Sequence, residues 1–103
     1  MELRQFTYVD MVATCGSFTK AAAKLFISQP ALSNYIGKVE EELGVKLFDR
    51  SSTPLTLTYA GEQYLKRARV ILGQIHEMDK EIRDITQNMK GKIRLGFPSE
   101  RII

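Results

Sequence analysis

Apolar residues recur three or four positions apart through most of the chain, and glycine or serine interrupts the runs. The first run stops at Gly16, the second follows Ser17, and the third lies between Ser28 and Gly44. Such spacing predicts amphipathic helices. Serine is favoured as an N-cap and glycine just past a last turn, so both ends of these helices are marked. The expected helices span about 3–14, 18–25 and 29–43.

Residues 18–37 predict two short helices joined by a tight turn, the arrangement of a helix-turn-helix. The turn is Phe26–Ile27. Many proteins with this motif have glycine in the turn, and we expect Phe26 to be packed there. Pro30 falls in the first turn of the following helix, where its missing N–H has no helical partner to lose.

The third helix separates an apolar face from a hydrogen-bonding one. Its predicted buried positions are Leu32, Ile36, Val39 and Leu43. The polar residues left outside are Gln29, Ser33 and Asn34. They gather in the N-terminal half, which a helix-turn-helix directs into the major groove of DNA.

A short hairpin is predicted after the third helix. The segments 45–50 and 55–57 favour strands and flank the turn residues 51–54, which together form a small wing. Thr58 is a candidate N-cap for a fourth helix. The strict capping box is absent because Gly61 occupies its third position, although Glu62 suits the positive end of a helix.

The fourth helix, expected over 59–90, carries an unbroken apolar seam with steps of four and three residues. Its members are Tyr64, Ala68, Ile71, Ile75, Met78, Ile82, Ile85 and Met89. This is the pattern of a coiled coil, and a helix of that span is about 48 Å long. Packing against the chain's own headpiece, the winged helix-turn-helix of residues 1–58, would account for the first two turns of this helix only. We therefore expect a homodimer through this helix.

Residues 92–97 alternate between polar and apolar, which predicts a strand without a partner in what remains. We therefore expect domains at 1–58 (the winged helix-turn-helix) and 59–90 (the linker and dimerisation helix). Residues 91–103 are expected to be the first strand of a truncated domain. The predicted fold class is mainly α, with a small β-hairpin wing and a long dimerising helix.

Composition narrows the possible functions. There is no run of 18 apolar residues and no basic-then-apolar start, and the single Cys15 suits a reducing cytoplasm. Residues 1–57 hold six charges of each sign, so the net charge of +3 lies wholly in 58–103. Bulk charge alone therefore does not indicate nucleic-acid binding. With His76 the only histidine and no glycine-rich phosphate loop, the chain offers no catalytic, metal or cofactor site.

Several motifs in order resemble the N-terminal domain of LysR-type bacterial transcriptional regulators, over about residues 1–97. They are Leu3-Arg4-Gln5-Phe6, Gly16-Ser17-Phe18-Thr19-Lys20-Ala21-Ala22, Ser28-Gln29-Pro30-Ala31-Leu32-Ser33, Glu40-Glu41-Glu42-Leu43-Gly44-Val45, Leu47-Phe48-Asp49-Arg50 and Leu57-Thr58-Tyr59-Ala60-Gly61. The resemblance implies a cytoplasmic, nucleoid-associated protein that binds an interrupted inverted repeat with a T…A core as a dimer. Tetramers and a small-molecule inducer are implied only for a full-length protein with an effector domain.

The resemblance also implies roles for individual residues. Gln29, Pro30 and Ser33 would face base edges. Ser17, Thr19 and Ser28 would hold phosphates, and Arg50 would anchor the wing to the DNA backbone. The full predicted DNA-binding set is Ser17, Phe18, Thr19, Lys20, Ser28, Gln29, Pro30, Ser33, Asn34, Lys38, Arg50 and Thr53. The alternative for Arg50 is an ion pair with Asp49 or with a helix end.

Two positions depart from many family members, which carry arginine where this chain has Asn34 and Thr53. Fewer cations weaken the sequence-independent part of DNA affinity, whereas asparagine can pair with an adenine edge. Two other functions fit the same elements. One is a winged helix that binds protein, and the other is a dominant-negative partner that pairs with full-length subunits through 59–90.

Overall fold

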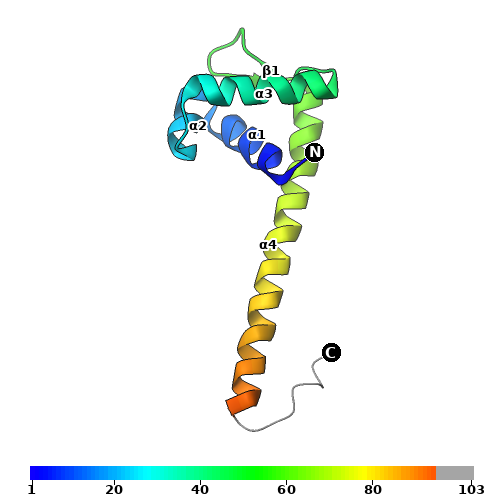
Figure 1. Ribbon diagram of the computed structural model, residues 1–103. Helices are drawn as coiled ribbons and strands as arrows, with labels where there is room; N and C mark the ends of the chain where they lie inside the picture. The colour runs from blue at the N-terminus through cyan, green and yellow to red at the C-terminus, as the bar shows by residue number, and fades with distance from the viewer. Residues whose placement is uncertain (95–103) are drawn as a thin grey trace. The chain divides into compact units, whose positions relative to one another are not determined.

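The computed structural model describes residues 1–94, with side-chain surroundings for residues 1–89. Its elements are α1 (Leu3–Cys15), α2 (Phe18–Leu25), α3 (Gln29–Leu43), β1 (Phe48–Asp49), β2 (Thr56–Leu57) and α4 (Tyr59–Arg94) (Figure 1). The mainly helical fold with one small hairpin and a long C-terminal helix is the one the sequence predicted. The chain divides into two compact units, Met1–Leu72 and a second unit that begins at Gly73.

The first unit is built around a core where α1, α2 and α3 meet. Its largest fully buried side chains are Leu32, Ile36, Leu47, Val9 and Val12. Ala21 and Ala22 of α2 are also buried, and such small side chains let helices approach closely. The predicted buried positions Leu32, Ile36 and Val39 of α3 face this interior. The prediction for Leu43 is wrong: it is 36% exposed, because it lies in the last turn before Gly44.

The predicted helix caps are confirmed. The Oγ atoms of Ser17 and Ser28 accept hydrogen bonds from the backbone N–H of Lys20 and Ala31, each at 3.2 Å. Gly16 and Gly44 take left-handed backbone angles after α1 and α3, which glycine adopts without steric cost. These local signals explain why the ends of α1 to α3 could be read from the chain.

The expectation that Phe26 is packed in the turn is wrong. Its side chain is 93% exposed, and it is the one non-glycine residue with positive φ (59°) in the part of the chain that the structure describes. The backbone explains the difference. Ile27 donates its N–H back to the carbonyl of Ala22, which closes α2 and turns the Phe26 side chain away from the core.

The wing is smaller than predicted. β1 and β2 have two residues each and pair antiparallel, with Phe48 opposite Leu57. Thr58 caps α4 as expected, because its Oγ1 accepts the N–H of Gly61 at 3.0 Å. Gly61 itself is buried, and a Cβ there would overlap the carbonyl oxygen of Leu47. The start of α4 packs so closely against the backbone of Leu47, just before β1, that this position requires glycine.

The start of α4 belongs to the first unit, which extends past the predicted boundary at 58. Leu65 and Ala68 are buried in this unit, and the Tyr64 ring lies 5.8 Å from that of Phe6. The prediction that Ala68 belongs to the dimer seam is therefore wrong, because the rest of the first unit covers it completely, and Tyr64 is half-buried against the same unit. This covering was the alternative that the sequence allowed for the first two turns.

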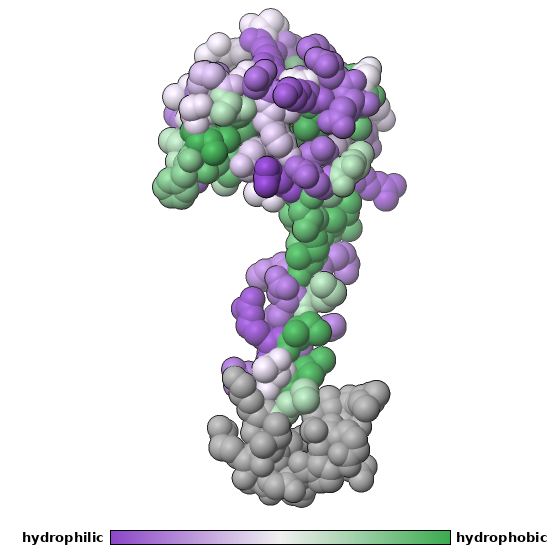
Figure 2. All heavy atoms as spheres, in the orientation of Figure 1, coloured by the Kyte–Doolittle hydropathy of each residue, from purple (hydrophilic) through white to green (hydrophobic). Residues whose placement is uncertain are grey.

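The rest of the predicted seam differs in exposure. Ile71, Met78, Ile82 and Ile85 are exposed, whereas Ile75 and Met89 are half-buried. Figure 2 shows apolar side chains following one another along this helix. α4 continues to Arg94, so residues 92–94 are helical where a strand was predicted. Residues 95–103, the remainder of that prediction, lie outside the described residues. Among residues 1–94, no helix has both the length and the apolarity needed to cross a membrane.

Candidate nucleic-acid interface

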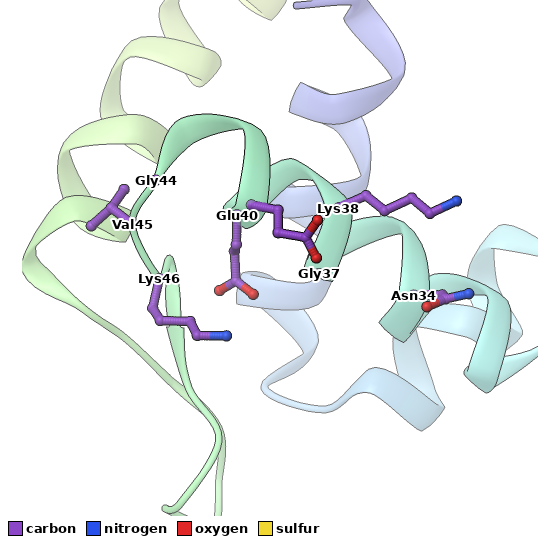
Figure 3. Close-up of a pocket in the computed structure, with 8 residues that line it drawn as sticks. Asn34, Gly37, Lys38, Glu40, Gly44, Val45 and Lys46 are labelled. Atoms are coloured by element: carbon purple, nitrogen blue, oxygen red, sulfur yellow. The ribbon is translucent and has the colours of Figure 1, made fainter.

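The outer face of α3 presents the polar surface that the sequence predicted. Gln29, Pro30, Asn34 and Lys38 are exposed, and Ser33 is half-buried. Asn34 and Lys38 are four residues apart, so they share a face, and Figure 3 shows both projecting from the same side of α3. The opposite face of the helix is packed in the core, where Leu32 and Ile36 are fully buried, and this packing fixes the position of the exposed face.

The residues of α2 lie at a second edge of the same surface. Thr19 and Lys20 are exposed, and Phe18 is half-buried. Ser17 and Ser28 are N-caps, so each uses an oxygen lone pair on its own helix while its O–H remains available as a donor. Helix N-termini carry partial positive charge and unpaired N–H groups. Both caps therefore lie where an anionic group is favoured. Thr53 is exposed in the wing.

Arg50 lies in the middle of a cluster that joins the wing to two helices. Its Nη1 donates to Ser33 Oγ at 3.0 Å, and its Nη2 pairs with Glu40 Oε1 at 3.3 Å. Its guanidinium carbon also lies 4.6 Å from the centre of the Phe18 ring. The ion-pair partner proposed from sequence, Asp49, is not the one observed.

Asp49 is occupied by a separate local turn. The side chain and the backbone N–H of Ser51 both donate to Asp49 Oδ1. These hydrogen bonds, that of the side chain first, lower the pKa of the Asp49 carboxyl below its ordinary value. The Asp49 carboxylate therefore holds the turn of the wing, and the ion pair of Arg50 is formed with Glu40 instead.

Glu40 is the functional residue that sequence reasoning missed. Its carboxylate is only 3% exposed, and its Oε2 accepts the backbone N–H groups of Leu47 and Phe48 at 2.7 and 3.2 Å. A buried charge needs such partners. The signal was present in the chain, since Glu40 falls four residues after buried Ile36 and so lies on the apolar face of α3.

A groove of about 570 Å³ runs beside the C-terminal half of α3. It is bounded by residues of α3 and of the following loop, which are Asn34, Gly37, Lys38, Glu40, Glu41, Gly44, Val45 and Lys46 (Figure 3). Lys38 of α3 and Lys46 of the loop are both among these lining residues. The sequence did not predict this groove, because only the turn at Gly44 brings the loop back along the helix. Within residues 1–94 no group of three or more His, Cys, Asp or Glu side chains is arranged to hold a metal ion.

Comparison with known proteins identifies the family of this fold. Residues 3–62 match the model for the bacterial regulatory helix-turn-helix proteins of the lysR family. Among curated relatives, the probable cat1 operon transcriptional activator of Acinetobacter lwoffii is 40% identical over 97 residues. That alignment covers 94% of this chain and 32% of the relative. BsdA of Bacillus subtilis (strain 168), a transcriptional regulator, is 38% identical over 97 residues, which cover 93% and 33% of the two chains. The chain thus spans about a third of the length of these relatives.

Solved structures give the same result. The DNA-binding domain of BenM in complex with benA site 1 DNA has a TM-score of 0.80 and 41% identity. The match covers 84% of this chain and 97% of that one. Full-length CbnR in complex with its target DNA has a TM-score of 0.72 and 37% identity, with 81% and 29% covered. The chain belongs to the LysR family of bacterial helix-turn-helix regulators, and its fold matches solved DNA-binding domains of that family.

Proposed function

We propose that this chain is the sequence-specific double-stranded DNA-binding headpiece of a transcriptional regulator. The observation that carries the proposal is the exposed outer face of α3, where Gln29, Pro30, Asn34 and Lys38 lie on a helix whose other face is fixed in the core. A helix of this kind fits the major groove. The similarity to a BenM domain in complex with DNA supports the same assignment.

Each part of the surface has a distinct chemical role in this proposal. The amides of Gln29 and Asn34 can each pair with two atoms of an adenine edge. Lys20 and Lys38 offer exposed cations beside the helix, and such cations pair with phosphates without reading sequence. The capped N-termini of α2 and α3 add backbone donors toward phosphates. Base pairing would therefore come from α3 and orientation from its surroundings.

We further propose that two chains act together through the exposed apolar positions of α4, so that two α3 helices read the two halves of an inverted repeat with a T…A core. Placement on the nucleoid in the cytoplasm follows from that role. A small-molecule inducer and a tetramer belong to the proposal only for a longer protein with an effector domain. Catalysis is no part of it.

The test is fluorescence anisotropy with a duplex that carries a T…A inverted repeat and with a scrambled duplex, over a series of salt concentrations. We expect the wild type to prefer the repeat by tenfold or more. Gln29→Ala should lose about 1–3 kcal/mol on the repeat with little change in salt slope. The matched control is Gln87→Ala, at an exposed position of α4, which should bind as the wild type does.

The competing function, a winged helix that binds protein, makes the opposite prediction. Duplex binding would then be independent of salt, and Gln29→Ala would change nothing. A dominant-negative partner would retain the DNA chemistry and differ only in pairing with longer subunits. Equal and weak binding to both duplexes would contradict sequence-specific recognition of the repeat.

A further inference from the structure

We propose that Arg50 is a positioning residue for DNA recognition: it fixes the hydroxyl of Ser33 as a hydrogen-bond donor directed at base acceptors, and it is not itself a phosphate anchor. The inference rests on the proposed function, because it concerns how the same α3 surface reads DNA. It departs from the role that family resemblance assigns to Arg50.

Three partners hold the Arg50 side chain, which is 38% exposed and uses two of its five N–H groups in these contacts. Ser33 Oγ lies 3.0 Å from Nη1, Glu40 Oε1 lies 3.3 Å from Nη2, and the Phe18 ring lies 4.6 Å from the guanidinium carbon. These partners come from α3 and α2, whereas Arg50 follows β1. A side chain held from three directions has already lost the freedom it would need to follow a phosphate.

Glu40 makes this arrangement rigid. Its carboxylate is buried, and its second oxygen is held by the N–H groups of Leu47 and Phe48. It therefore cannot swing outward with Arg50 toward DNA without leaving two buried donors unpaired, which is costly. The ion pair thus ties the wing strand to α3 at a fixed position.

The consequence falls on Ser33. A hydroxyl has one O–H and two lone pairs, and Arg50 donates to one lone pair. The adjacent positive charge disfavours the approach of a further donor. Ser33 is left to donate its O–H. In the major groove the matching acceptors are guanine N7 and O6, adenine N7 and thymine O4, whereas the amino group of cytosine N4 is a donor. Arg50 thereby restricts Ser33 to base edges that present an acceptor for its O–H.

The experiment has a DNA-free arm and a DNA arm, both on the chain as it stands. In the first, urea unfolding is measured for Ser33→Ala, Arg50→Lys and the double variant. We expect less-than-additive losses, because both single variants break the same contact. The control is Arg83→Lys at an exposed position of α4, which should leave unfolding unchanged. Additive losses would overturn the inference whatever the DNA arm shows.

In the second arm, affinities are measured for repeat duplexes that carry every single base-pair change in a half-site. We expect one position where the wild type discriminates by tenfold or more and where Ser33→Ala and Arg50→Lys both lose that discrimination. A uniform loss for Ser33→Ala at all positions would mean a phosphate contact and would overturn the assignment.

A neutral pair, Glu40→Gln with Arg50→Gln, tests the phosphate alternative, because it removes the cation without leaving a buried charge unpaired. Its folding is checked by circular dichroism. We expect the discrimination at the Ser33 position to be lost and the salt slope to stay as in the wild type. A slope reduced by about 0.9 per headpiece, with the base profile intact, would show that Arg50 is a phosphate contact and would overturn the inference. If the wild type shows no base preference at all, the proposed function fails, and the unfolding arm still decides whether Arg50 and Ser33 are coupled.

Discussion

Tyr35 links the beginning of the chain to α3 and has a measurable signature. Its hydroxyl donates to Glu2 Oε1 at 2.8 Å, and its ring lies 4.9 Å from that of Tyr8. Burial, followed by the hydrogen bond to Glu2, raises the pKa of Tyr35 to about 12. The neutral phenol is thus the form that the folded protein stabilises.

The sign of the pH effect follows from this direction. The folded pKa lies above the ordinary value of 10.0, so the contribution of Tyr35 to stability is complete below pH 10 and is lost as pH rises toward about 12. Absorbance at high pH should show a transition near pH 12 that disappears in Tyr35→Phe. Glu2→Gln should move this transition downward only in part, since burial is the larger cause. Glutamine can still accept the hydrogen bond, so a transition that stays in place in Glu2→Gln would contradict the contribution of the Glu2 charge.

Phe26 is strained by its backbone and exposed in its side chain, so its replacement separates the two effects. Non-glycine residues in the left-handed region cost about 1–2 kcal/mol, part of which glycine returns through its freer unfolded state. We expect Phe26→Gly to raise the free energy of unfolding by about 0.5–1 kcal/mol. Phe26→Ala keeps the strain and loses only an exposed ring, so it should change little. Thermal unfolding of the three proteins checks this, and an equal rise in both variants would assign the effect to the ring.

At the scale of elements, the packing of the start of α4 against the backbone of Leu47 depends on a glycine at position 61. A Cβ at Gly61 would overlap the Leu47 carbonyl, whereas nothing lies within 4 Å of one at Gly73. We expect Gly61→Ala to destabilise the fold by about 1–3 kcal/mol or more. Gly73→Ala, in the same helix, should stabilise it by about 0.5–1 kcal/mol. Urea unfolding compares them, and equal effects would show that the close approach is relieved without cost.

The face of α3 should respond to an added cation. Asn34 is exposed and lies four residues before Lys38 on α3, so Asn34→Arg places a charge on this face, at a position where the family resemblance implies an arginine in many members. We expect tighter binding to scrambled DNA, a salt slope steeper by about 0.9 per headpiece and a changed base preference. Gln87→Arg adds the same charge on α4 and should do none of this. Anisotropy over a salt series measures both, and a variant unaltered in slope and preference would place Asn34 outside the DNA contact.

The ends of the helices could be predicted because their signals are local. Ser17, Ser28 and Thr58 cap the starts of α2, α3 and α4, and Gly16 and Gly44 end α1 and α3. The predicted polar face of α3 is exposed for the same reason, since period and capping fix which side of a helix is buried. The exception on α3 is Leu43, which was predicted to be buried and is exposed in the last turn of the helix.

The rest depended on contacts between distant residues. Sequence spacing placed Glu40 in a charged run, and only the fold brings Leu47, Phe48 and Arg50 onto its carboxylate. The groove beside Lys38 and Lys46 arises in the same way. Tyr64 follows the heptad spacing of the seam, yet it packs on Phe6 of the same chain. A heptad pattern shows which side of a helix is apolar and does not show which surface covers that side.

At the scale of the whole molecule, the exposed apolar side chains of α4 carry the assembly. Ile82 is 56% exposed and Met78 58% exposed, and burying such side chains yields about 1.5–3 kcal/mol each. We therefore expect a dimer at micromolar concentration in sedimentation equilibrium. The double variant Met78→Asp with Ile82→Asp places four carboxylates in the dimer seam and should weaken association at least a hundredfold.

The control must change charge equally at exposed positions that lie outside the predicted seam. His76→Asp with Gln87→Asp does so, since both positions are exposed, and we expect it to remain dimeric.

DNA binding then connects assembly to function. The seam variant should keep the fold of the first unit, whose core includes Leu65 and Ala68, and should bind one half-site as the wild type does. It should lose the gain from a second half-site, because two linked headpieces bind the repeat with a raised effective concentration. A seam variant that stays dimeric, or a monomer that binds the full repeat as tightly as the wild type, would contradict recognition by paired headpieces.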